Sequence, residues 1–129
     1  GARAVLNFGH TFAHAIEQAS KYRVVHGAAV ALGLRAAGVL ARDRTGWSHV
    51  DHHRVLKALR RAGLRVAMPK LSTDSIVEAM RHDKKRRDGV LKFVLPVRLG
   101  EVRVGVDVPD SDVRMAITTL ATRPVRGSW

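Results

Sequence analysis

Residues 27–43, GAAVALGLRAAGVLARD, form a run of small and apolar side chains in which Arg35 is the only charge before the last two residues. A helix that is apolar around its whole circumference is typical of the interior of a fold, where other elements cover several of its sides. The run therefore predicts a buried central helix. At 129 residues and 46% hydrophobic content, the chain is long enough for one domain with one modest core.

The flanking segments predict further helices and one change of period. Serine or threonine before an apolar pattern indicates a helix start, glycine after it a helix end, and alternation in twos indicates strands. The expected elements are a helix over 3–19, a helix over 50–62 capped by Ser48 and ended by Gly63, a helix from Ser72 or Thr73 to about His82, a β-hairpin of 90–97 and 101–108 with Pro96 at an edge, and a helix over 109–121. The fold class predicted is mainly α, a single helical domain over 1–129 with one small β-hairpin.

The charge balance is strongly basic, with 23 Lys+Arg against 11 Asp+Glu and a net charge of +12. Such an excess raises nucleic acid as a partner. However, the cations are spread along the chain, only residues 81–89 form a dense basic run, and aromatics make up 5%. We therefore expect no nucleic-acid partner, although helix 50–62 keeps a small basic DNA-binding domain open as an alternative.

The composition also limits the chemistry and the compartment. There are no cysteines, so a metal site would have to use His, Asp or Glu. No apolar run is long enough to span a bilayer, and we expect no membrane partner and a cytoplasmic location.

Polar residues follow one side of the first predicted helix. Arg3, Asn7, His10 and His14 are spaced by 4, 3 and 4, and therefore share one face, which Glu17 continues. A solvated face usually carries Lys and Glu rather than Asn and His, which are poorer helix formers. Histidines four apart can share a metal, but the glutamate of the HExxH motif is absent here. Spacing alone leaves a metal site and a solvated face both open. Gly9 indicates that another backbone or a ligand comes close.

Three motifs together resemble the C-terminal domain of the 3-dehydroquinate synthase family. They are RxxLNFGHTxxHAIE (3–17), HGxAVAxG (26–33) and DKKxxDGxLxFVLP (83–96), and the similarity runs from Gly1 to about Ile117. The resemblance implies a lyase of the shikimate pathway, and hence of aromatic amino acid biosynthesis. Such enzymes convert a seven-carbon keto-acid sugar phosphate (3-deoxy-arabino-heptulosonate 7-phosphate) to 3-dehydroquinate plus phosphate. They use NAD and a divalent metal, normally zinc.

The resemblance also implies roles for particular residues. Position by position, the metal ligands are His10 and His26, the substrate-binding residues are Arg3 and Asn7, and the catalytic residues are His14 and one of Lys84 and Lys85. These roles suit the residue types, because a metal polarises an oxygen, cations hold an anionic substrate and histidine titrates near neutrality.

Departures from the family pattern qualify this assignment. In the family, an N-terminal NAD-binding domain precedes the matching segment, and so does a third metal ligand, a glutamate. We therefore expect this chain to be the C-terminal part of a homodimeric enzyme and to be inactive by itself. Ala28 stands where the family commonly has Glu. The loss of that carboxylate is expected to weaken metal binding. A related sugar phosphate cyclase, an aminocyclitol or cyclitol synthase, is the alternative within the same class.

Overall fold

The computed structural model of the chain describes residues 9–64, 70–89 and 91–122. Its elements are α2 (His10–Ala19), α3 (His26–Arg44), α4 (His49–Arg61), α5 (Thr73–Arg86), β1 (Phe93–Arg98), β2 (Glu101–Val106) and α6 (Asp110–Thr122). The strands pair as an antiparallel hairpin. The predicted fold class, mainly helical with one hairpin, is confirmed. Among the described helices none is long and apolar enough to cross a membrane.

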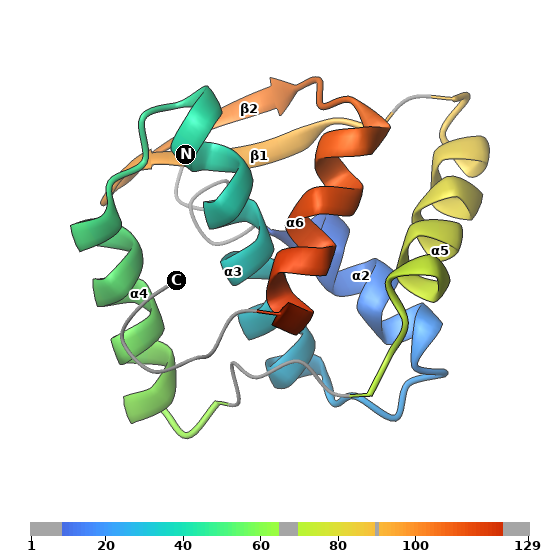
Figure 1. The fold of residues 1–129 in the computed structure, drawn as a ribbon, viewed down its shortest axis with the longest axis horizontal. Helices are drawn as coiled ribbons and strands as arrows, with labels where there is room; N and C mark the ends of the chain where they lie inside the picture. The colour runs from blue at the N-terminus through green and yellow to red at the C-terminus, as the bar shows by residue number, and fades with distance from the viewer. Residues whose placement is uncertain (1–8, 65–69, 90, 123–129) are drawn as a thin grey trace.

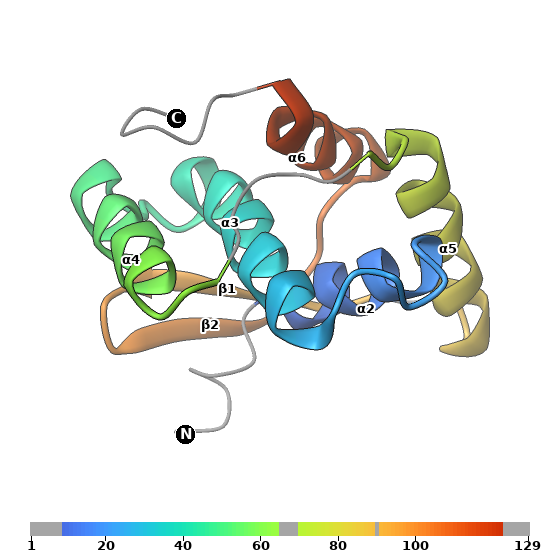
Figure 2. The same ribbon diagram turned by 90° about the horizontal axis from the view of Figure 1, so that it is seen from below.

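Helix α3 is the centre of the fold, as its sequence predicts. It packs against α2, α4, α6 and β1, and Figures 1 and 2 show it running between α4 on one side and α2 and α6 on the other. Buried residues occur around most of its circumference, including the side chain of Arg35. One guanidinium nitrogen of Arg35 donates to the backbone oxygen of Leu120 at 3.3 Å, so the buried charge also ties α3 to α6.

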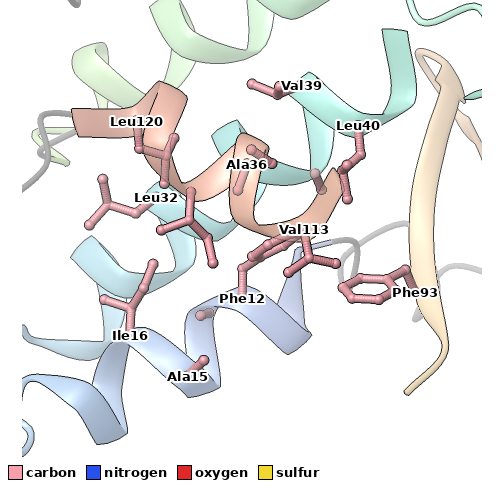
Figure 3. Close-up of a cluster of buried hydrophobic side chains, with 14 of the residues drawn as sticks. Phe12, Ala15, Ile16, Leu32, Ala36, Val39, Leu40, Phe93, Val113 and Leu120 are labelled. Carbon is pink, nitrogen blue, oxygen red and sulfur yellow. The ribbon is translucent and has the colours of Figure 1, made fainter. Parts of the chain in front are cut away.

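The core forms where α2, α3, α6 and the hairpin meet (Figure 3). Its buried side chains include Phe12, Ile16, Leu32, Ala36, Leu40, Phe93, Val113 and Leu120. The rings of Phe12 and Phe93 lie 5.5 Å apart between centroids and tilted by 43°, a favourable aromatic geometry. This contact joins the first turns of α2 to the hairpin, and the polar side of α2 is therefore turned away from the core.

Two of the predicted helix starts are confirmed by their caps. The Ser48 side chain accepts a hydrogen bond from the backbone N–H of Asp51, and Ser72 accepts one from Ser75. The predicted end of α5 near His82 is wrong, since the helix continues to Arg86. Its last turn carries Lys84, Lys85 and Arg86, and cations at a helix C-terminus are stabilised by the helix dipole. The lysine run therefore lies on a helix.

The predicted continuous helix over 3–19 is wrong at Gly9. This residue has φ 85° and ψ −3°, a left-handed conformation that ordinary side chains rarely adopt, and α2 begins only at His10. Gly9 lies directly against Gly33 of α3: a Cβ atom added at Gly33 would lie 2.4 Å from the Gly9 carbonyl oxygen. The prediction that another backbone approaches Gly9 is thus confirmed, because no side chain fits between the two glycines.

We predict that Gly33→Ala destabilises the fold by about 1–3 kcal/mol or more, because backbone atoms must move to admit the methyl group. Gly27→Ala on the same helix is the matched control. There the added atom meets only the flexible end of Leu64, at 3.1 Å, and alanine favours the helix by up to about 1 kcal/mol. Urea unfolding of both variants checks this; equal free energies of unfolding would contradict the proposed backbone contact.

Helix α4 packs on α3 through the buried ring of His52. His52 is 1% exposed, its Nδ1 accepts a hydrogen bond from Trp47 Nε1 at 3.0 Å, and Gly38 of α3 leaves the space for the ring. Burial, and then the positive charge of Arg35, lowers the pKa of His52 from 6.5 to about 3. The ring is therefore neutral in the folded protein at neutral pH.

This burial makes stability depend on pH. Below pH 6.5 the unfolded chain binds a proton at His52 that the folded chain takes up only near pH 3, so the free energy of unfolding falls as pH falls through that window. The expected slope is about 1.4 kcal/mol per pH unit. His52→Asn, whose amide oxygen takes nearly the place of Nδ1 and so keeps an acceptor for Trp47, should flatten the slope. His53→Asn, at an exposed position of α4, should not. Denaturant titrations between pH 7 and 4 measure the free energy of unfolding of each variant and its slope with pH.

Candidate functional site

The polar side of α2 is centred on His10 and His14. The two residues are one turn apart and share a face of the helix, with His10 exposed and His14 partly exposed. Phe12, Ala13 and Ile16 on the other faces are buried. The prediction that these two histidines lie on one helical face is confirmed.

His14 has a hydrogen-bonding neighbour on its own helix. Gln18, one turn further along α2, places its side-chain Nε2 3.2 Å from His14 Nε2. An amide NH₂ group is a donor only, so His14 Nε2 is the acceptor and the ring proton sits on Nδ1. His14 therefore presents an N–H donor, and its ring lone pair is engaged within the helix.

His26 is brought back to α2 by a tight turn. Lys21 and Tyr22 have φ values of 53° and 62°, a left-handed conformation that is uncommon for residues other than glycine. Two hydrogen bonds of the Ser20 hydroxyl, to Glu17 O and from Val24 N, brace the turn. Because the return is this tight, His26 lies beside the last turn of α2, where its Nδ1 is 3.2 Å from Glu17 Oε2.

The antiparallel packing of α2 and α3 fixes the order of these groups. Gly9 meets Gly33 at one end of the pair and Glu17 meets His26 at the other. His10 is seven residues before Glu17, or about 10 Å along the helix axis, with His14 between them. His10, His14 and His26 therefore follow one line along the polar side of α2, a set we name the histidine row.

Imidazole nitrogens are suitable ligands for zinc, and His10 and His26 supply two of them from adjacent helices. Within residues 9–64, 70–89 and 91–122 no three His, Cys, Asp or Glu side chains come together as a complete metal site. A catalytic zinc takes about three protein ligands. Because His26 contacts Glu17, roughly two turns along α2 from His10, the convergence of His10 and His26 on one zinc ion stays a prediction.

Lys84 and Lys85 lie on the last turn of α5 and have different surroundings. Lys84 Nζ is 3.8 Å from Asp110 Oδ1, and its side chain lines a small cavity together with Met80 and Phe93. Lys85 is exposed, three residues after His82, which lines a groove with Gln18 of α2. Residues three apart share a helix side, so Lys85 lies on the edge of α5 that adjoins α2.

Helix α5 packs against the end of α2. The start and middle of α5 adjoin the end of α2, where Asp74 and Glu78 line the groove beside Gln18 and Ala19. The two helices pack against each other, and Figures 1 and 2 show α5 at the edge of the molecule, beside the end of α2.

The two remaining predicted site residues, Arg3 and Asn7, fall outside the described residues. Their substrate-binding roles stay predictions that rest on the family resemblance alone.

Sequence reasoning missed the partners of the histidines. Glu17 was assigned only to the polar face, and Gln18 received no role. The signal was present in the spacing, since Gln18 follows His14 by four residues, which places them one above the other on a helix. The Glu17 to His26 contact depends on the turn geometry, which the spacing does not give.

Comparisons with known proteins bear directly on this arrangement. A family model described as 3-dehydroquinate synthase C-terminal matches residues 1–86. The 3-dehydroquinate synthase of Prochlorococcus marinus (strain MIT 9313) is 40% identical over 122 residues, covering 94% of this chain and 33% of that protein. That of Synechococcus sp. (strain CC9605) is 41% identical over 119 residues, covering 92% of this chain and 32% of the relative. The chain thus spans about a third of the length of these relatives.

A solved structure shows the same fold. It is ValA, a 2-epi-5-epi-valiolone synthase from Streptomyces hygroscopicus subsp. jinggangensis 5008 with NAD+ and Zn2+ bound. It superimposes with a TM-score of 0.74 at 31% sequence identity, covering 88% of this chain and 32% of ValA.

Proposed function

This chain belongs to the 3-dehydroquinate synthase family, and on that premise we propose that it forms the metal- and substrate-binding part of a 3-dehydroquinate synthase. The proposed reaction is the conversion of 3-deoxy-arabino-heptulosonate 7-phosphate to 3-dehydroquinate plus phosphate, a carbon–oxygen lyase step of the shikimate pathway. The substrate is a small sugar phosphate. A homodimeric enzyme and a cytoplasmic location stay predictions.

The observation that carries the proposal is the different hydrogen bonding of two histidines. Gln18 donates to His14 Nε2, so the His14 lone pair is engaged and its Nδ1–H is free to donate. His26 bonds through Nδ1 to a carboxylate, which leaves its Nε2 for a metal. This supports the assignment of His26 as a metal ligand and of His14 as a group that contacts substrate.

His10 and His26 would hold the zinc ion. When bound, the metal polarises a substrate oxygen. His14 lies between these residues along α2, in a position to donate its Nδ1 proton to a substrate oxygen or to exchange a proton with it. We assign the substrate-anchoring role to Lys85, because it adjoins α2 and no ion pair of it occurs among the described residues, whereas Lys84 faces Asp110.

NAD would be bound elsewhere in the enzyme. Gly27, Gly33 and Gly38 lie inside α3, so they do not form the glycine-rich loop that holds a dinucleotide phosphate. Because the relatives are about three times as long as this chain, we propose that the remaining two-thirds of such an enzyme supplies the NAD site.

A related sugar phosphate cyclase is the second candidate function. It is favoured by the 31% identity and similar fold of ValA. The 40% identity to a 3-dehydroquinate synthase over 94% of the chain favours the first candidate. Substrate preference in an active protein decides between them.

We predict that zinc binding depends on His10 and His26 and not on His14. His10→Ala and His26→Ala should weaken zinc binding at least tenfold, because each removes a ligand, whereas His14→Ala should leave it within about twofold. Calorimetric zinc titration of the chain measures this, with His53→Ala on α4 as a control for the loss of an exposed histidine. Loss of binding in His14→Ala with full binding in His26→Ala would reverse the two assignments.

The catalytic proposal is tested by a chimera. Residues 1–129 replace the matching third of the Prochlorococcus marinus enzyme, and phosphate release is measured with NAD and zinc. The chimera should turn over the heptulosonate phosphate, and the isolated chain should not. Lys85→Ala should raise KM at least tenfold by removing an anchor for the anionic substrate, and Lys84→Ala should raise it less.

Two outcomes of this test contradict the proposal. A folded chimera that binds NAD and zinc but turns over only a sugar phosphate without the acid group would favour the related cyclase. A larger effect of Lys84→Ala than of Lys85→Ala would exchange the roles of the two lysines.

A further inference from the structure

We propose that Glu17 is a positioning residue for the metal site: its carboxylate accepts the Nδ1 proton of His26 and holds the ring with Nε2 free for the metal. The inference rests on the proposed function, because it takes His26 to be a metal ligand. It adds a residue outside the ligand and substrate-binding roles assigned from the family resemblance.

The geometry of the pair supports this role. Glu17 Oε2 lies 3.2 Å from His26 Nδ1, and the two residues come from the last turn of α2 and the first position of α3. The Glu17 side chain is 15% exposed, whereas that of His26 is 71% exposed. The Glu17 carboxylate is thus largely surrounded by protein atoms, whereas the His26 ring extends toward solvent, where a metal can reach it.

The chemistry of the contact selects one form of the ring. An ionised carboxylate only accepts hydrogen bonds, so the proton of a neutral His26 ring must sit on Nδ1. The lone pair then sits on Nε2, the atom that a metal needs. A carboxylate bonded to the far nitrogen of a ligand histidine fixes the ring and raises its basicity, and loss of such a partner typically costs 10–100-fold in metal affinity.

Glu17 also bears on the substitution at position 28. The sequence predicts weaker metal binding because Ala28 provides no carboxylate near His26. In the structure, the carboxylate that contacts His26 comes from the neighbouring helix, nine residues earlier in the chain. Support for this ligand therefore does not require an acid at position 28.

The rival explanation is purely structural. Helix α3 has no acidic residue in its first turn and no side-chain cap at Val25, so a carboxylate beside its N-terminus would stabilise the helix dipole. In that case Glu17 would contribute to the stability of α3 without determining the state of the His26 ring. The two explanations predict different results for the tautomer.

The decisive measurement is the His26 tautomer, read from the ring ¹⁵N shifts by NMR on the metal-free chain at pH 8.5. The wild-type ring should be in the Nδ1–H form, and Glu17→Ala should shift it toward the Nε2–H form that solvated histidine favours. Glu17→Gln, whose amide oxygen still accepts, should retain the Nδ1–H form. Gln18→Ala is the matched control on the same turn: it should change the His14 ring and leave His26 unchanged.

Zinc affinity gives the second readout, measured by competition with a chromophoric chelator. Glu17→Ala should weaken binding 10–100-fold, and Glu17→Gln by less. An unchanged His26 tautomer, or unchanged zinc affinity, in a folded Glu17→Ala chain would overturn the proposal and leave the structural explanation. If His26→Ala does not affect zinc binding, the assignment of His26 as a metal ligand fails instead, whatever tautomer the wild-type His26 ring shows.

Discussion

The arrangement of the site depends on the contact between the backbones of Gly9 and Gly33. A Cβ atom on either glycine would lie within 2.5 Å of backbone atoms of the other glycine, so any side chain would separate the start of α2 from α3. Interiors are close-packed, and such a separation would not be confined to one point. It would change the position along the axis of α2 at which His26 contacts the last turn of that helix. Two residues without side chains thus help to determine where His26 lies beside α2.

The turn between the two helices imposes the second constraint. Two consecutive left-handed residues, Lys21 and Tyr22, cost free energy that glycine would not, since L-residues resist this conformation. Strain of this kind persists where the surrounding structure determines it, and it occurs often near functional sites. Here the hydrogen bond from Val24 N to the Ser20 hydroxyl and the contact of Glu17 with His26 both span the strained pair. The turn between α2 and α3 is short enough to bring His26 into contact with α2.

Most of the fold was predictable because it follows from local patterns. The all-apolar run gave the central helix, serine caps gave the starts of α4 and α5, and alternation gave the hairpin. The errors occurred where tertiary contacts decide. The left-handed conformation of Gly9 accompanies a close backbone contact with Gly33, which is distant in sequence and which a helical pattern does not reveal. The extra turn of α5 is supported by the buried Asp83, which pairs with Arg87 beyond the end of the helix.

The same limit applies to the candidate site, and it shows why residue type alone does not assign roles. His14 and His26 are chemically identical, and both carry their proton on Nδ1 in the arrangement described here. The difference lies in which nitrogen the neighbour uses. Gln18 donates to Nε2 and leaves His14 as a hydrogen-bond donor, whereas Glu17 accepts from Nδ1 and leaves His26 as a lone-pair donor. Adjacent residues of one helix, an amide and an acid, thus leave different ring atoms available in the two histidines, an N–H group in His14 and a lone pair in His26, as the proposed substrate and metal roles require.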